Sequence, residues 1–192
     1  MQLVKPLPPI AELEKCFSYD PSTGELRHKK RDSSYFKAQN VYSTWNKRYA
    51  ESLIRTTDNN GYYVVYFLGE RYAAHRLIWK LIHKKDPSYF IDHINGVRTD
   101  NRSTNLRACT WADNTRNTPA RVNNTSGYKG VYWSRNRNKW FAKIQFNKKI
   151  YGCGFYKTAY EAHLAYEAKA KELFGEFAFN KETWKGENNA KT

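Results

Sequence analysis

One short segment, residues 91–117, gathers acidic, amide and imidazole side chains at close spacing. It begins with the sequence Ile-Asp-His-Ile-Asn-Gly and contains further Asp and Asn residues up to Asn117. An imidazole is largely neutral near pH 7, because its ordinary pKa is about 6.5, so His93 can take a proton from water. Carboxylate and carboxamide oxygens are the donors that a hard divalent ion such as Mg²⁺ prefers. A base for water and a cation for the phosphate are the parts that phosphodiester hydrolysis needs.

The elements around this segment are expected to be a strand, a loop, a strand and a helix. Residues 90–94 and 106–110 are short and apolar enough for two strands, and the Asn-Gly pair at Asn95 is a turn signal between them. Thr110 can cap a helix that continues to Asn117. The sequence therefore predicts that the polar side chains lie on one ββα unit.

Residues 91–117 resemble the HNH endonuclease family, and most closely its phage and intron-type homing members, which carry Asn at the second and third motif positions. The resemblance implies a ββα-metal fold in which Asp92 binds the metal and His93 is the general base. It also implies that Asn105 holds the loop and orients His93, and that Asn114 is the second metal ligand. Asn in place of His at the third position favours Mg²⁺ or Mn²⁺ over Zn²⁺.

Other pieces of the chain resemble the same group of proteins. They are Asp100-Asn101-Arg102, Asn105-Leu106-Arg107, Ala74-His75-Arg76-Leu77 and the stretch Asp20 to Leu26, so the likeness covers most of residues 17–117. Two polar residues in this region have simpler explanations. His75 lies on an expected helix, where a packed histidine is more frequent than a ligand, and Asn117 is expected to be a helix cap.

Upstream of the motif, turn signals and apolar spacing predict a series of short elements. A helix is expected over 9–17, a turn over 20–24, strands over 26–31, 62–68 and 71–73, and a helix over 74–83 that ends before Asp86-Pro87. Residues 32–50 are polar and aromatic, and their pattern predicts no element.

The pattern changes after a polar run at 118–126, which is the expected linker. Apolar and polar residues then alternate, which predicts three antiparallel strands over 128–134, 139–146 and 149–155. Thr158 and Glu161 fit a capping box, so a helix is expected to begin there and to end near Gly175. One helix on the apolar face of a three-stranded sheet is the predicted arrangement.

Eight Lys and Arg residues and no acids lie between Gly127 and Lys157. Residues 127–180 resemble the AP2 DNA-binding domain of plant transcription factors and phage HNH proteins, through Tyr128-Lys129-Gly130-Val131, Lys139-Trp140, Ala142-Lys143-Ile144, Gly152 to Phe155 and Ala165-Tyr166. In that family the exposed sheet face enters the major groove. The resemblance places Tyr132, Lys143, Gln145, Lys149 and Tyr151 on this face, with Arg135 and Arg137 in a turn.

Composition agrees with a polyanionic partner. The 192 residues carry a formal net charge of +15, and aromatic residues make up 16%. Basic charge with many aromatic residues favours nucleic acid. Three cysteines without a Cys-x-x-Cys pair argue against a disulfide framework or a Cys-ligated zinc site, and no stretch is long and apolar enough for a membrane helix. A cytoplasmic protein is expected, in a bacterial host cell if it is phage-encoded.

These observations predict an α+β protein and a function. Residues 1–117 would form the N-terminal region and the nuclease domain with its ββα core at 90–117, followed by the linker 118–126, the DNA-binding domain 127–180 and a tail 181–192. The function would be a metal-dependent endonuclease acting on double-stranded DNA, with a monomer favoured. A non-catalytic DNA-binding regulator with a degenerate HNH fold is the main alternative, and an RNA-binding protein is the second. The target sequence, nicking or double-strand cutting, and an intron-encoded or free-standing gene stay open.

Overall fold

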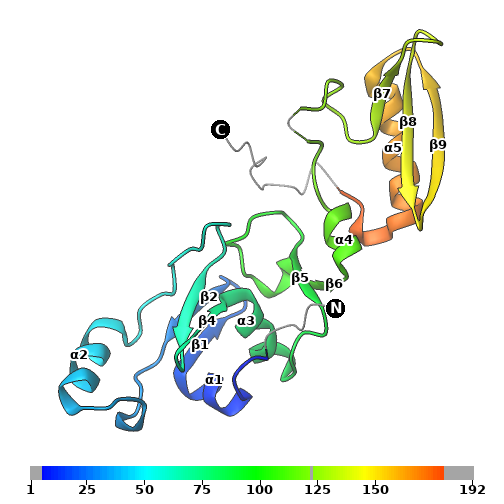
Figure 1. Ribbon diagram of the computed structural model, residues 1–192. Helices are drawn as coiled ribbons and strands as arrows, with labels where there is room; N and C mark the ends of the chain where they lie inside the picture. Colours follow the sequence, from blue (N-terminus) through cyan, green and yellow to red (C-terminus); the bar gives the residue numbers. More distant parts are fainter. Residues whose placement is uncertain (1–5, 122, 180–192) are drawn as a thin grey trace. The chain divides into compact units, whose positions relative to one another are not determined.

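The computed structural model describes residues 6–121 and 123–179, which fall into two compact units, 1–109 and 110–192 (Figure 1). Val122 of the expected linker, Asn180 and the expected tail 181–192 lie outside the described residues. None of the helices in the described ranges is both long enough and apolar enough to cross a membrane.

The first unit is built from three antiparallel hairpins and three helices. The strand pairs are β1 (Phe17–Asp20) with β2 (Glu25–His28), β3 (Val64–Phe67) with β4 (Glu70–Ala73), and β5 (Phe90–His93) with β6 (Leu106–Cys109). The helices are α1 (Ile10–Cys16), α2 (Gln39–Tyr49) and α3 (Ala74–His83), with 3-10 turns η1 (Ser33–Tyr35) and η2 (Ser103–Asn105). The helix expected over 74–83 is confirmed as α3, whereas the helix expected over 9–17 ends at Cys16 because Phe17 already pairs with His28.

One hydrophobic core holds these hairpins together. Leu77 and Ile78 of α3 are fully buried in it, and each buried side chain of this size contributes about 1.5–3 kcal/mol. Ile91 of β5 and Leu106 of β6 belong to the same core. The strand that carries Asp92 and His93 is therefore anchored through its neighbours to the interior of the unit.

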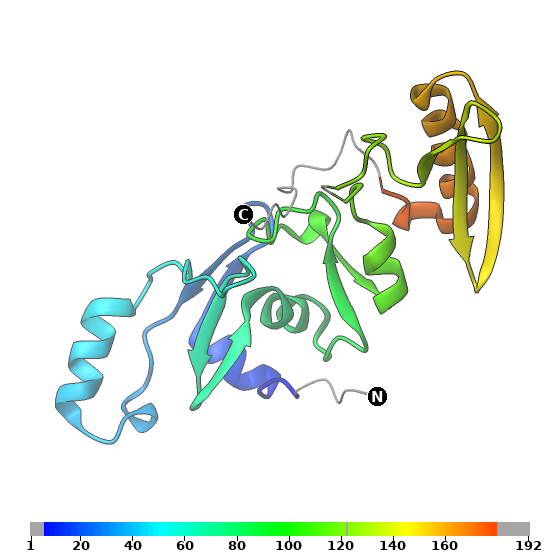
Figure 2. The ribbon, with the colours of Figure 1, turned by 45° about the horizontal axis from the view of Figure 1, so that its top comes forward.

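Helix α2 forms within residues 32–50, where the sequence predicts nothing, and it stands apart from the three hairpins in both views (Figures 1 and 2). None of its residues is buried. Ring contacts and hydrogen bonds attach it: the Arg31 guanidinium lies 4.0 Å from the ring centroid of Trp45, and the Trp45 ring contacts His28 at 5.3 Å. Asn46 also accepts from the Arg31 N–H at 2.9 Å and donates to the Arg31 carbonyl at 3.0 Å. Apolar periodicity could not reveal such a helix, because cation–π contacts, ring contacts and polar contacts of Asn46 hold it in place.

The second unit contains helix α4, a three-stranded antiparallel sheet and helix α5. Their bounds are α4 (Trp111–Arg116), β7 (Val131–Ser134), β8 (Lys139–Phe146), β9 (Lys149–Tyr156), α5 (Ala159–Phe174) and the 3-10 turn η3 (Gly175–Phe177), with strand order β7-β8-β9. Helix α5 lies along one face of the sheet (Figures 1 and 2). The predicted sheet is confirmed, and so is the Thr158–Glu161 capping box.

Helix α4 is fastened to this second unit. The Lys129 ammonium donates to the carbonyl oxygens of Arg116 and Thr118 at 2.9 and 2.8 Å, and the Arg116 guanidinium lies 5.0 Å from the rings of Phe146 and Phe174. The division between compact units therefore falls between residues 109 and 110, ahead of α4, and not in the expected linker 118–126. The functional domain limits drawn from the sequence stay a prediction.

Candidate active site

The β5–β6 hairpin positions Asp92 and His93. Asp92 is paired in register with Arg107 and His93 with Leu106. Asp92 is 6% exposed and His93 is 4% exposed. Polar groups buried to this extent require hydrogen-bond partners, so their partners define the site.

Arg107 holds the Asp92 carboxylate. Its Nε and Nη2 donate to the same oxygen, Oδ2, at 2.9 and 2.7 Å. Both side chains are nearly buried, with exposed fractions of 10% and 7%. A charged hydrogen-bonded pair of this kind fixes the orientation of the carboxylate at the end of the strand.

The His93 imidazole has a polar partner at Nε2 and two aromatic rings close by. Its Nε2 lies 3.0 Å from Oδ1 of Asn101, and its ring centroid lies 5.3 Å from that of His75 and 5.8 Å from that of Tyr62. Burial lowers the pKa of His93, and the Asn101 hydrogen bond opposes this shift. His93 is therefore neutral near pH 7, as a general base must be.

His75 is packed against this imidazole. Burial and the neighbouring His93 lower the pKa of His75 to about 3. Its ring also contacts Tyr62 at 5.1 Å. These contacts agree with the expected packing role, in which an uncharged His75 imidazole lies against His93 at one side of the site.

Asn105 holds the loop between β5 and β6. Its Oδ1 accepts from the backbone N–H of Asn95 at 3.0 Å, and its Nδ2 donates to Asn95 Oδ1 at 2.9 Å and to the Asp100 carbonyl at 2.7 Å. The loop-holding role implied by the family resemblance agrees with these bonds. A hydrogen bond to the His93 ring comes from Asn101, which the sequence pattern includes in the family resemblance but to which it assigns no role.

The same loop is tied further by Asp100. Its carboxylate accepts from Asn95 Nδ2 at 2.7 Å and from Arg102 Nη2 at 2.5 Å. The Arg102 hydrogen bond lowers the pKa of Asp100, so the carboxylate stays ionised and both contacts persist at neutral pH. The segment that carries Asn101 is thus rigidly closed by side-chain contacts.

Asn114 lies on α4 in the second unit. The helix begins with a capping box in which Thr110 and Asp113 bond reciprocally, and the Asn114 N–H donates to the Thr110 carbonyl at 3.1 Å. Asn117 is the C-cap residue, as expected. Because Asp92 and Asn114 belong to different compact units, their action on one metal ion is a proposal.

The outer face of the second unit's sheet carries part of the expected DNA-binding set. Tyr132, Lys143 and Gln145 are exposed on the face opposite α5, and the Lys143 ammonium lies 5.2 Å from the Tyr132 ring centroid. Arg135 and Arg137 are exposed in the β7–β8 turn. These five residues lie where a polyanion could reach them.

The outward placement of Lys149 and Tyr151 is wrong. Lys149 pairs with Phe146 and Tyr151 with Ile144, and paired residues share a sheet face. Ile144 is 3% exposed beneath α5, so both residues belong to the helix-covered side. The two-residue turn at 147–148, with both φ angles positive, sets this register and turns Ile150 outward instead.

Among the residues that the structure describes, no three or more His, Cys, Asp or Glu side chains cluster as a metal site. Such a cluster is not what the predicted donor set requires, since that set consists of one carboxylate and one carboxamide. Carboxylate and carboxamide oxygens are ordinary ligands of Mg²⁺, which usually keeps several water ligands as well. The residues present therefore fit a hard divalent ion.

Comparison with known proteins places this site in a family. Residues 72–116 match the HNH endonuclease family. Protein 3.8 of Escherichia phage T7 is 30% identical over 105 residues, which cover 54% of this chain and 86% of the relative. The uncharacterized HNH endonuclease L560 of Acanthamoeba polyphaga mimivirus is 35% identical over 121 residues, 62% of each chain. A solved structure on DNA binding and cleavage by the HNH homing endonuclease I-HmuI is 23% identical, with a TM-score of 0.37 over 57% of this chain and 55% of that one.

The chain belongs to the HNH endonuclease family. The matched region contains α3, the β5–β6 hairpin and α4, and so includes Asp92, His93, Asn105 and Asn114. The protein is accordingly a nuclease, and the family match covers the site without extending to the sheet of the second unit.

Proposed function

We propose that this protein is a metal-dependent endonuclease that hydrolyses phosphodiester bonds of double-stranded DNA. In this proposal His93 is the general base, and Asp92 and Asn114 hold one Mg²⁺ or Mn²⁺ ion. The observation that carries the proposal is the placement of the His93 imidazole, fixed by a hydrogen bond of 3.0 Å, directly beside Asp92 in a strand of the family's motif.

The chain's own residues divide the chemistry. His93 accepts a proton from the attacking water, and Asn105 keeps the surrounding loop closed through Asn95 and Asp100. Arg107 holds the Asp92 carboxylate in a fixed orientation. When bound, the divalent ion supplies positive charge for the phosphate and the leaving oxygen.

Residues 127–180, within the second unit, are the proposed DNA-binding domain, of AP2-like type. Support comes from the basic residues on its exposed sheet face and β7–β8 turn, Lys143, Arg135 and Arg137, and from the net charge of +15. A sheet face can enter the major groove, where base edges carry a distinct donor and acceptor pattern. With cleavage and sequence recognition on separate domains, the sheet can position the protein along the DNA sequence while the nuclease domain contacts mainly the DNA backbone.

A plasmid assay tests the proposal. Supercoiled DNA incubated with the protein and Mg²⁺ is expected to become nicked or linear, and EDTA is expected to stop the reaction. His93→Ala should abolish cleavage while still shifting the DNA in a gel. His83→Ala, which removes an exposed imidazole at the end of α3, is the matched control and should cut normally.

The same assay decides between this function and the non-catalytic alternative. A DNA-binding regulator would shift the plasmid and leave it supercoiled with either metal ion. Equal cleavage by wild type and His93→Ala would refute the role given to His93. Because a monomer carries one site, we expect nicked circles to accumulate before linear DNA.

A further inference from the structure

The contact between Asn101 and His93 has a specific chemical consequence. Asn101 is 2% exposed, and its Oδ1 lies 3.0 Å from His93 Nε2. A side-chain carbonyl oxygen only accepts hydrogen bonds, so Nε2 must carry the proton. In a neutral imidazole the remaining lone pair then resides on Nδ1, which becomes the one atom able to accept a proton.

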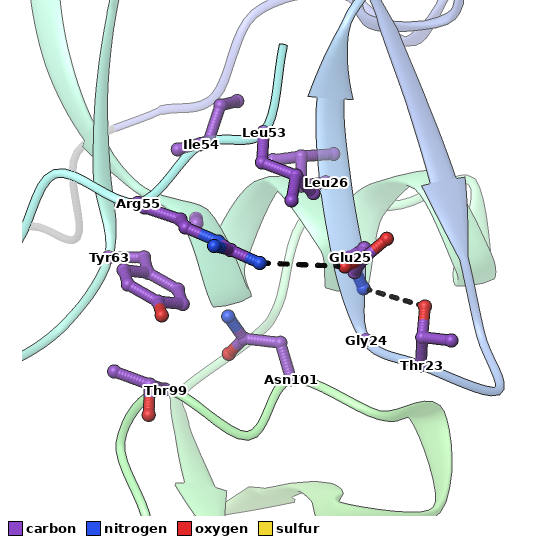
Figure 3. A pocket seen from close by; sticks show the side chains of 11 residues that line it. Thr23, Gly24, Glu25, Leu26, Leu53, Ile54, Arg55, Tyr63, Thr99 and Asn101 are labelled. Atoms are coloured by element: carbon purple, nitrogen blue, oxygen red, sulfur yellow. Dashed lines mark hydrogen bonds and ion pairs between the residues drawn. The ribbon is translucent and has the colours of Figure 1, made fainter. Parts of the chain in front are cut away.

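The orientation of the Asn101 amide agrees with this assignment. Asn101 lines a pocket of about 190 Å³, bordered by Gly24, Glu25 and Arg55 among others. Figure 3 shows its amide nitrogen directed toward the side of the pocket where Glu25 and Arg55 lie, with the oxygen turned away from them. The carbonyl is therefore the group left to face the imidazole.

Asn101 is itself held by the distant β1–β2 hairpin. The Tyr19 hydroxyl donates to the backbone carbonyl of Asn101 at 2.9 Å, and the Ser103 N–H donates to the Pro21 carbonyl at 3.2 Å. Gly24, with φ +77°, approaches so closely that a Cβ there would lie 2.7 Å from the Asn101 carbonyl carbon and 2.5 Å from the Arg102 nitrogen. The hairpin turn thus presses directly on the backbone that positions the Asn101 amide.

We propose that Asn101 is a positioning residue of the nuclease. Its side-chain carbonyl holds His93 as the Nε2–H tautomer, with Nδ1 as the atom that accepts the proton, and the β1–β2 turn holds Asn101 in place. This gives a role to the Asp20 to Leu26 segment, whose residues resemble the family although they lie far from the motif. The inference rests on the proposed function of His93 as base. Asn101 acts through His93 and touches neither the phosphate nor the metal in this scheme.

Two substitutions at Asn101 test whether its side-chain carbonyl oxygen is needed as the hydrogen-bond acceptor for His93. Asn101→Leu removes the acceptor, and Asn101→Asp keeps an acceptor oxygen in the same place. We expect Asn101→Leu to lower kcat for plasmid cleavage about 10- to 100-fold, the usual cost of losing such an orienting partner, with KM little changed. Asn101→Asp should retain most of the activity.

A spectroscopic readout makes the test independent of cleavage. In long-range ¹H–¹⁵N spectra, the His93 ring nitrogens of the wild type should show the Nε2–H pattern, and Asn101→Leu should lose it while keeping the wild-type circular dichroism. A folded Asn101→Leu protein that keeps the Nε2–H pattern or the wild-type kcat would overturn the inference. Failure of the base assignment is a separate outcome, seen as full activity of His93→Ala.

A milder pair of variants covers the case in which Asn101→Leu does not fold. Tyr19→Phe deletes the hydroxyl that donates to the backbone carbonyl of Asn101. Tyr156→Phe, in the second unit, deletes a comparable hydrogen bond of 2.7 Å from a hydroxyl to the backbone carbonyl of Cys153. We expect Tyr19→Phe to lower kcat several-fold and to broaden the His93 ring signals, with Tyr156→Phe unchanged in both. Equal behaviour of the two variants would overturn the role of the hairpin.

Discussion

Arg107 places two guanidinium nitrogens on one carboxylate oxygen of Asp92, the residue proposed to bind the metal. The two residues face each other across the β5–β6 ladder. A guanidinium on the carboxylate orients it and also reduces the negative charge that an ion would meet. The pair is buried, so removal of the arginine alone leaves a charge that water cannot reach easily.

This relationship predicts how stability should depend on metal. Arg107→Gln is expected to lower the free energy of unfolding by about 3 kcal/mol, because it leaves the buried Asp92 carboxylate without its cation. Mg²⁺ should then restore part of the loss, since it can replace that charge. Thermal unfolding with and without Mg²⁺ measures both effects, and the Mg²⁺-induced rise in Tm should be larger in Arg107→Gln than in the wild type.

The control for that experiment removes the proposed ligand as well. In the double variant Arg107→Gln with Asp92→Asn no buried charge remains, so Mg²⁺ should give little stabilisation. A Tm rise of the same size in wild type, single variant and double variant would show that Asp92 does not hold the ion.

Two partly buried histidines, His28 and His75, predict acid sensitivity. Burial, reinforced by Arg31, lowers the pKa of His28 to about 4, and the pKa of His75 is lowered to about 3. Between pH 6.5 and 4 the unfolded chain binds protons that the folded chain does not, so stability falls as pH falls through this range. Because His28 is only partly buried, screening by solvent limits this loss to about 1–2 kcal/mol. Urea unfolding at a series of pH values should show a shallower slope for His28→Gln, and an unchanged slope would contradict this account.

The corrected strand register predicts that two lysines differ in DNA binding. Lys143→Ala should weaken binding and lower the slope of log K against log salt by about one, as expected for loss of a phosphate contact. Lys149→Ala, on the helix-covered side of the paired strand, should leave the slope near the wild-type value. Fluorescence anisotropy over a range of salt concentrations measures both, and a larger effect of Lys149→Ala would mean that the outer face is not the binding surface.

The hairpin contact at Gly24 predicts a difference between two glycines with similar backbone angles. Gly24 and Gly69 have φ values of +77° and +78°, but a Cβ at Gly69 meets no atom within 4 Å. Gly69→Ala should therefore cost only the left-handed backbone penalty, about 1–2 kcal/mol. Gly24→Ala should cost clearly more and should also slow cleavage. Chemical unfolding compares the two variants, and equal losses would argue against close packing of the β1–β2 turn on the Asn101 backbone.

The local part of this fold follows from local pattern. Helix α3 was predicted at its observed bounds because its apolar residues repeat at helical spacing. The Thr158–Glu161 capping box was predicted from residues three positions apart, and Thr110 was predicted as a helix cap, although its reciprocal bond with Asp113 was not. Helix α2 escaped prediction because contacts with Arg31 and His28, outside its own sequence, hold it. The faces of Lys149 and Tyr151 were assigned wrongly because a strand's alternation tells which residues share a face, but not which face is covered.

The sequence by itself determined the chemistry available to this protein: an Asp-His pair, amide side chains at motif spacing and a basic sheet, all readable because motif and charge are properties of nearby residues. Only the tertiary structure decided which amide reaches the imidazole. Asn101 meets His93 within a closed loop, yet its place depends on Tyr19 and Gly24 from the β1–β2 hairpin. Contacts between segments so far apart in the chain arise from folding of the whole unit, and no spacing along the sequence records them.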